Sequence, residues 1–342
     1  MATMTTGEIK LAGATGGARG TQAAPTLDGL LGIDGLSAEQ LRGLLTLAAA
    51  VKADPSAYAG RLSDLSVTML FEKPSLRTRM SFEIGLTKLG MHAVYYDHGA
   101  QRIGERECVK DYALNLERWT DAIVARVYDH RVLEQMAQHA SVPIVNALSD
   151  VEHPCQALAD MLTIGERFGR APGDLSGLKM AWIGDGNNVC HSLMLASAKL
   201  GMSFTAITPK GFEPQFSVLQ KAMRAGEQTG ATITLGRGLD DLRGHHAVYT
   251  DTWVSMGQES QNGLRADAFT GYTVDAEVMA VAGDGLDDPE GIGSAFMHCL
   301  PAHRGEEVTD EVIDSDASVV YDQAENRMHA QNALFLKLFG KG

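Results

Sequence analysis

Apolar and polar residues alternate along the chain in two rhythms, which predict helices and strands in turn. From Ser37 onward, leucines and alanines recur at helical spacing, with Ser37 as a candidate N-cap. Short apolar runs follow, each succeeded by an amphipathic stretch. The order predicts strands at residues 65–73, 92–97, 121–128 and 142–148, with helices at 79–90, 109–119 and 132–140 between them. Such alternation is typical of a parallel α/β domain.

A second alternating series begins near residue 176. It predicts a helix at 188–201, a further helix after residue 209, and strands at 179–183, 203–209, 245–251 and 295–301. A strongly helical stretch at 153–169 leads from the first series into the second. The last segment, residues 323–340, contains an amphipathic helix that we expect to pack back on the first domain.

These patterns predict an α/β fold with two parallel-sheet domains joined by helices. We expect a disordered Gly/Ala/Thr-rich tail over residues 1–25, a first domain over 26–160 and a second over 161–322. In parallel sheets, ligands bind at the carboxyl ends of the strands or between domains, so candidate chemistry is sought there.

Composition excludes several classes of protein. Hydrophobic residues make up 44% and charged residues 21% of the 342 residues, the proportions of an ordinary globular protein. The 29 basic and 43 acidic residues give a net charge of -14, so we expect neither a nucleic-acid nor a membrane partner. The sequence has no bilayer-spanning apolar run and no secretory signal. Four widely spaced cysteines predict reduced thiols in a cytoplasmic protein, and their spacing does not suggest zinc.

The segment Pro74 to Arg79 lies between a predicted strand and a predicted helix. Hydroxyls and guanidinium groups beside the free amides of a helix N-terminus can bind phosphate. The alternative is that Ser75 and Thr78 only cap the helix while Arg77 and Arg79 pair with acids such as Glu83. Arg126, at the end of the third strand, is either a second phosphate ligand or a solvated charge.

His153 and Gln156 are three residues apart at the start of the linking helix. This spacing puts them on one face, where an imidazole and an amide suit a carbonyl or phosphate oxygen. Alternatively, His153 caps the helix and Gln156 is solvated. Cys155 faces elsewhere and is expected to pack in the core.

Two further strand ends carry polar groups. The Gly-Asp-Gly-Asn-Asn turn at 184–188 lacks the third glycine and the following acidic residue of a dinucleotide site. Asn187 and Asn188 suit an amino-acid ligand better. Asp251 ends another strand and can hold a cationic amine.

Cys299, in the His-Cys-Leu-Pro turn, is a candidate nucleophile with His298, His303 or His329 as its base, although no helix N-terminus lowers its pKa. A metal site from His298 and His303 lacks an evident third ligand. Arg327 stands just ahead of the amphipathic stretch, where it either reaches a ligand or pairs with Glu325.

Together, Ser-Leu-Arg-Thr-Arg, His-Pro-Cys-Gln, Asp-Thr-Trp-Val-Ser-Met-Gly and His-Cys-Leu-Pro, in this order, resemble the motifs of the ornithine carbamoyltransferases, within the aspartate/ornithine carbamoyltransferase superfamily. The resemblance covers about residues 35–338. It implies transfer of a carbamoyl group from carbamoyl phosphate to the δ-amine of L-ornithine, giving L-citrulline and phosphate in arginine metabolism. It also implies a carbamoyl-phosphate domain, an ornithine domain and a homotrimer with sites at subunit interfaces, without cofactor or metal.

The resemblance assigns roles to residues that match its motifs. A phosphate cradle is implied for Ser75, Arg77 and Thr78, with Leu76 contributing its backbone amide. Contacts to the carbamoyl group and phosphate are implied for Arg126, His153 and Gln156. Ornithine would be held by Asn188, Asp251, Ser255 and Met256, while Cys299, Leu300 and Arg327 position the reacting carbonyl and amine.

Two departures from the family pattern affect these roles. Leu76 stands where relatives have threonine, which removes one hydroxyl from the cradle. Arg102 stands where relatives often carry glutamine or histidine that reaches a neighbouring subunit's site, and we expect it to insert there and contact phosphate. Transfer to another amine, such as N-acylornithine, putrescine or aspartate, stays open, as does a non-catalytic binding protein with the same fold.

Overall fold

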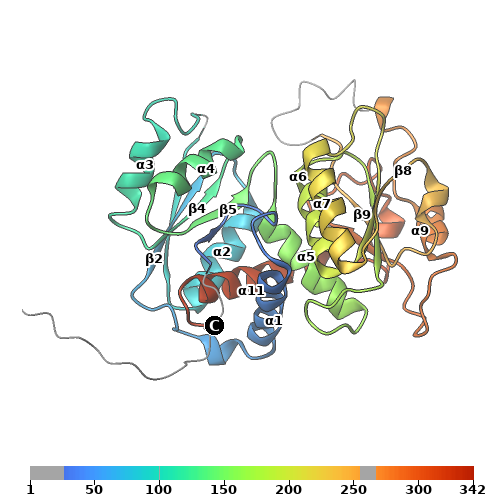
Figure 1. Cartoon of the computed structure of the whole chain (residues 1–342), viewed down its shortest axis with the longest axis horizontal. Coiled ribbons are helices and arrows are strands. Elements are labelled where there is room, and N and C mark those ends of the chain that lie inside the picture. Colours follow the sequence, from blue (N-terminus) through green and yellow to red (C-terminus); the bar gives the residue numbers. More distant parts are fainter. Residues whose placement is uncertain (1–26, 100, 255–266) are drawn as a thin grey trace, which may run out of the picture.

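The computed structural model describes residues 27–99, 101–254 and 267–342, and contains two α/β lobes, each built on a five-stranded parallel sheet (Figure 1). The sheet of the first lobe has the order β1-β5-β4-β2-β3, and that of the second lobe β10-β9-β6-β7-β8. The two parallel-sheet domains predicted from the sequence are therefore confirmed. The predicted tail, residues 1–25, lies outside the described residues.

The elements of the first lobe follow the predicted alternation. Ser37 caps α1, and its hydroxyl accepts from the backbone N of Gln40 in a capping box. The elements are β1 (Gly29–Leu30), α1 (Ala38–Ala53), η1 (Pro55–Tyr58), β2 (Ser66–Phe71), α2 (Leu76–Lys88), β3 (His92–Asp97), α3 (Val109–Leu116), β4 (Ala122–Arg126), α4 (His130–His139) and β5 (Ile144–Leu148).

The second lobe contains one strand, β8, and two short helices, α9 and α10, that sequence reasoning did not specify. β8 was not predicted, because this short edge strand buries only Ile233 and lacks a clear apolar run. Its elements are β6 (Lys179–Ile183), α6 (Asn188–Leu200), β7 (Ser203–Ile207), α7 (Phe216–Thr229), β8 (Ile233–Gly236), η2 (Leu239–Leu242), β9 (Ala247–Thr250), α9 (Ala276–Gly283), β10 (Ala295–His298) and α10 (Asp310–Ile313).

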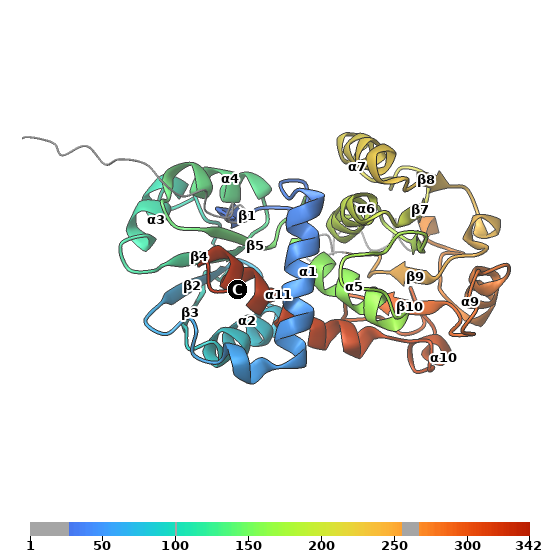
Figure 2. The same cartoon turned by 60° about the horizontal axis from the view of Figure 1, so that its bottom comes forward.

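Three helices lie at the junction of the lobes. α5 (Pro154–Arg167) packs against α6 of the second lobe and against α1 and α11 (Val320–Leu338). Figure 2 shows α1 running along this junction with α5 and α11 beside it. α11 also packs against α2, so the last helix of the chain lies against the first lobe. No helix of the described residues is long and apolar enough to cross a membrane.

Two helices begin earlier than the sequence pattern indicated. α2 begins at Leu76 and α11 at Val320. The prediction that Arg327 stands ahead of the last helix was therefore wrong, because Arg327 lies within α11. Residues 320–326 contain neither proline nor glycine, and Gln323 and Asn326 are buried by packing. Tertiary contacts therefore extend the helix through a stretch that looks polar in the sequence.

Candidate active site

The N-terminus of α2 forms a small polar turn at the carboxyl end of β2. Ser75 is the N-cap, and its Oγ accepts from the backbone N of Thr78 at 3.4 Å and lies 3.0 Å from Thr78 Oγ1. Arg79 pairs with Glu83, as the alternative interpretation expected, while Arg77 points elsewhere and is half-buried. Leu76 is 74% exposed. Its side chain therefore leaves the turn free, in keeping with a role for its backbone alone.

Three guanidinium groups converge near this turn. Arg126 and Arg327 are almost fully buried, which contradicts the picture of Arg126 as a solvated strand-end charge. Burial, together with the neighbouring charges of Arg327 and Arg77, lowers the pKa of Arg126 to about 9. The Nε atoms of Arg126 and Arg327 are buried and have no hydrogen-bond partner among the described residues. A buried, mutually repelling set of donors is suited to an anion such as phosphate.

Arg327 connects this cluster to two other helices. Its Nη2 donates to Thr78 Oγ1 at 2.8 Å, and its Nη1 donates to Gln156 Oε1 at 2.9 Å. Arg327 is thus held by buried neutral oxygens, and the alternative pairing with Glu325 is not the contact that the structure shows.

His153 and Gln156 both lie in the buried junction. His153 is the N-cap of α5 but makes no side-chain capping bond, and its buried Nδ1 has no hydrogen-bond partner in the part of the chain that the structure describes. Burial, followed by repulsion from Arg327 and Arg126, lowers the pKa of His153 well below its ordinary value, so the ring is neutral. Gln156 is buried, not solvated, and its Nε2 donates to Asp160 Oδ1 at 2.9 Å.

Sequence reasoning missed Asp160 and Gln323. Oδ1 of the fully buried Asp160 also accepts from Gln323 Nε2 at 2.8 Å, and its Oδ2 accepts from the hydroxyl of Tyr249 at 3.1 Å. Burial raises the pKa of Asp160 to about 6 despite these bonds. Asp160 follows Gln156 by four residues on a helix, so their spacing was a usable signal. Nothing local indicated Gln323.

The second lobe contributes Asp251, which directly follows β9. Its Oδ1 accepts from Cys299 Sγ at 3.0 Å, and its Oδ2 accepts from Asn187 Nδ2 at 2.8 Å. Asn188 instead donates to the backbone oxygen of Ser149 at 2.5 Å, which links the two lobes. The neighbouring asparagine therefore supports Asp251, while Asn188 lies at the lobe junction. Ser255 and Met256 lie outside the described residues.

Cys299 and Leu300 form the turn after β10. Burial, then the nearby carboxylate of Asp251, raises the pKa of Cys299 well above its ordinary value, so the group is a thiol that donates a hydrogen bond. A protonated thiol is a poor nucleophile. Within residues 27–99, 101–254 and 267–342, two groups of side chains have suitable metal-ligand chemistry, Asp251 with His298 and Cys299, and His303 with Glu306 and Glu307. His298 and His303 thus fall in separate groups.

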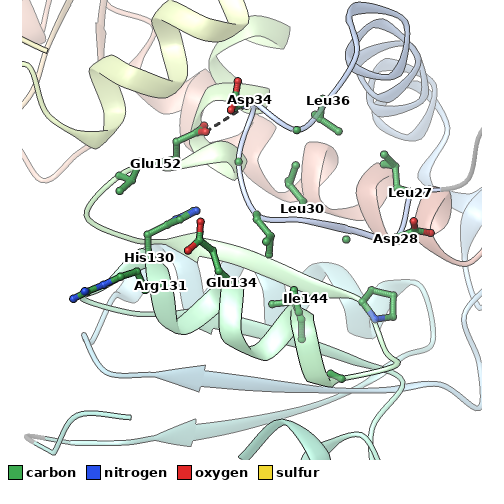
Figure 3. Close-up of a pocket in the computed structure, with 18 of the residues that line it drawn as sticks. Leu27, Asp28, Leu30, Asp34, Leu36, His130, Arg131, Glu134, Ile144 and Glu152 are labelled. Atoms are coloured by element: carbon green, nitrogen blue, oxygen red, sulfur yellow. Dashed lines mark hydrogen bonds between the residues drawn. The ribbon is translucent and has the colours of Figure 1, made fainter. Parts of the chain in front are cut away.

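Arg102 lies beside a groove of about 1370 Å³ between the segment 27–36 and α4 (Figure 3). Its guanidinium carbon is 3.4 Å from the ring centroid of Tyr128, and Lys73 Nζ is 4.1 Å from the same centroid. Burial, then Arg126 and Arg102, lowers the pKa of Lys73 to about 8. Lys73 was also missed, although it precedes the phosphate turn in the sequence.

Comparison with known proteins agrees with this arrangement. Residues 29–166 match the model of the "Aspartate/ornithine carbamoyltransferase, carbamoyl-P binding domain" and residues 176–338 that of the "Asp/Orn binding domain". The chain belongs to the aspartate/ornithine carbamoyltransferase family. In this family it resembles the ornithine carbamoyltransferase of Shewanella oneidensis, with 48% identity over 309 residues, 90% of this chain and 98% of the relative.

Solved structures of ornithine carbamoyltransferases have the same fold. That from Pyrococcus furiosus is 41% identical, with a TM-score of 0.85 over 93% of this chain and 99% of that one. That from Thermus thermophilus is 42% identical, with a TM-score of 0.78 over 92% of this chain and 99% of that one. The resemblance of the four motifs to this family is therefore confirmed over nearly the whole chain.

Proposed function

We propose that this protein is an ornithine carbamoyltransferase that transfers the carbamoyl group of carbamoyl phosphate to the δ-amine of L-ornithine. The observation that carries the proposal is the cluster of buried Arg126 and Arg327 with half-buried Arg77 beside the turn at Ser75, in a chain whose relatives are named for this reaction. All three guanidinium groups interact electrostatically with Cys299, whose thiol bonds to Asp251. The arginine cluster and Asp251 can therefore bind dianionic carbamoyl phosphate and the amine of ornithine in one site.

The proposed reaction is direct transfer. The neutral amine attacks the carbonyl carbon, a C–N bond forms, the C–O bond to phosphate breaks, and the leaving phosphate carries away the amine proton. Arg77, Arg126 and Arg327 stabilise negative charge on the departing phosphate. Neutral His153 hydrogen-bonds the carbamoyl oxygen without adding a charge. Binding both reactants in line removes several kcal/mol of the bimolecular cost.

The other proposed site residues divide between the two substrates, carbamoyl phosphate and ornithine. Ser75, Thr78, the amide of Leu76 and Gln156 complete the phosphate and carbamoyl contacts. Asn188, Asp251, Ser255 and Met256 hold ornithine, while Cys299 and Leu300 orient its amine. Cys299 does this as a hydrogen-bond donor, because its thiol remains protonated. Carbamoyl phosphate is already activated, so the reaction requires no cofactor and no resident metal.

We assign the carbamoyl-phosphate domain to residues 26–160, with the helix in 323–340 packed on it, and the ornithine domain to residues 161–322. The contacts of α11 with α1 and α2 support this division, because they tie the end of the chain to the first lobe.

We propose a homotrimer in the cytoplasm that serves arginine biosynthesis. An exposed apolar stripe on α2, formed by Leu76, Met80 and Ile84, lies next to the edge strand β3, where Val94 and Tyr96 are exposed. Exposed apolar surface of this kind is typical of subunit contacts. The four cysteines are free, which suits a reducing compartment.

The test is an assay of citrulline formation by the purified protein with carbamoyl phosphate and a set of competing amines. We expect L-ornithine to be preferred over N-acetylornithine, putrescine and aspartate. No citrulline above background at millimolar substrates would refute the proposal, and preference for an acylated ornithine would change the substrate.

A further inference from the structure

His298, the last residue of β10, is held by bonds that fix its protonation state. Its Nδ1 lies 2.8 Å from the backbone N of Leu300, and its own backbone N donates to Gln323 Oε1 at 3.0 Å. A backbone N–H can only donate a hydrogen bond, so Nδ1 must accept and carries no proton. The ring is therefore neutral in this geometry, with its hydrogen on Nε2.

That hydrogen points at a buried carboxylate. Nε2 of His298 is 3.2 Å from Oε1 of Glu307, and both side chains are fully buried. The same oxygen accepts from the backbone N of His303 at 2.6 Å. Glu307 therefore holds the turn from 298 to 303 at both of its ends. In this geometry it also selects the tautomer of His298 that accepts from Leu300.

The turn held in this way has an unfavourable backbone conformation. Leu300 has φ of 58°, in the left-handed region that a bulky residue rarely adopts. Such a conformation persists only where the surroundings enforce it. Within this turn, Cys299 places its thiol 3.0 Å from Asp251 Oδ1. The position of the Cys299 thiol, which bonds to Asp251, thus depends on how firmly the turn is held.

We propose that Glu307 is a positioning residue for carbamoyl transfer, acting through His298 to fix the turn that carries Cys299 and Leu300. The inference rests on the proposed function, because that function gives the turn its role in holding ornithine. The hydrogen bonds of the Glu307 carboxylate go to His298 and His303, which are not among the residues proposed to hold the substrates. Its second carboxylate oxygen, Oε2, is buried, makes no hydrogen bond within the described residues and lies 3.9 Å from His303 Nδ1. In the described part of the chain, the hydrogen bonds of this carboxylate are therefore those that hold the turn.

The experiment compares Glu307→Ala with Glu307→Gln. Alanine removes the acceptor for both ends of the turn, whereas glutamine keeps an amide oxygen that can accept from His298 and His303. We expect Glu307→Ala to lower kcat/KM for ornithine by about tenfold or more, because small misplacements of reacting groups are costly. The KM for carbamoyl phosphate should change little, since its cradle is on α2. Glu307→Gln should restore most of the ornithine activity.

The matched control is Glu306→Ala, which removes a neighbouring carboxylate that is largely exposed. It should behave as wild type. If Glu307→Ala does not fold, His298→Leu serves instead, because leucine has neither the donor for Glu307 nor the acceptor for the backbone N of Leu300. Either variant should also react faster with a thiol reagent at Cys299.

Equal losses for both substrates, or a folded Glu307→Ala enzyme with wild-type ornithine kinetics, would overturn the inference. A wild-type protein that makes no citrulline would instead refute the proposed function. In that case, unchanged thiol reactivity of Cys299 in Glu307→Ala would separately overturn the structural role.

Discussion

Arg327 Nη2 lies 2.8 Å from Thr78 Oγ1, although 249 residues separate the two in sequence. Through this bond the last helix holds the first turn of α2. The bond from Nη1 of the same guanidinium to Gln156 adds α5 to the assembly. The polar groups proposed to bind carbamoyl phosphate therefore form one buried network, in which a change at any one residue alters the others.

Substitution of Arg126 by alanine should sharply impair use of carbamoyl phosphate. Its guanidinium is buried, and its Nε has no hydrogen-bond partner among the described residues, so its loss removes a proposed phosphate ligand from the buried cluster. We expect kcat/KM for carbamoyl phosphate to fall about 10² to 10³-fold in steady-state assays. Arg131→Ala, at an exposed arginine paired with Asp129, is the control. Equal kinetics in the two variants would contradict the role of Arg126.

Asp160→Asn should change how stability depends on pH. Burial raises the folded-state pKa of Asp160 to about 6, above its ordinary value of 3.8. The folded protein thus binds the Asp160 proton more tightly than the unfolded chain does. The stability that this proton contributes is complete below about pH 4 and is lost as the pH rises through 6. Asparagine does not titrate. Urea unfolding should show the variant gaining up to about 3 kcal/mol relative to wild type between pH 4 and 7.

Asp240→Asn, at an exposed carboxylate, gives the background effect of the same substitution on the surface. If the difference in unfolding free energy between Asp160→Asn and wild type stays constant from pH 4 to 7, Asp160 is already ionised at pH 4 and the prediction is wrong.

Cys299 should resist alkylation near neutral pH. Its pKa is raised well above the ordinary value by burial and by Asp251, while Cys108 is exposed. Treatment with iodoacetamide followed by peptide mass mapping should find Cys108 labelled first, with activity retained. In the Cys108→Ser variant, rapid inactivation together with labelling of Cys299 would instead support Cys299 as a reactive nucleophile.

Arg102→Ala tests whether Arg102 contacts carbamoyl phosphate across a subunit interface. Insertion beside the dianion predicts a rise of about tenfold or more in the KM for carbamoyl phosphate, with ornithine affinity less affected. The stacking of Arg102 on Tyr128 holds the side chain near Lys73 and Arg126 of its own chain, where positive charge accumulates. Kinetics indistinguishable from wild type would make Arg102 a surface residue.

Ile84→Asp should break the proposed trimer. Ile84 belongs to the exposed apolar stripe on α2, and a charge there would be buried without a partner in an assembled interface. Light scattering coupled to size exclusion should show wild type as a trimer and the variant as smaller species. Phe216→Asp, at an exposed aromatic on α7, should leave assembly unchanged. A monomeric wild type would refute the assembly.

Local patterns were sufficient for most of the fold. Strands such as β2, β4 and β6 bury nearly every residue, so their apolar runs are visible in the sequence. Ser37 was a recognisable cap because a capping box depends on residues three apart. β8 was missed because a half-exposed edge strand leaves a weak pattern. The start of α11 was placed too late because its first turns are largely polar, although Gln323 and Asn326 are buried there.

By itself, the sequence determined that two parallel α/β domains would form and that polar motifs would stand at the ends of their strands. Only the tertiary structure decided that Arg126 and Gln156 are buried, that Asn187 rather than Asn188 supports Asp251, and that Asp160 and Gln323 join the network. The reason is physical. Periodicity reports which face of an element is apolar, whereas the partner of a polar group depends on segments that meet from distant parts of the chain, as Arg327 and Thr78 do.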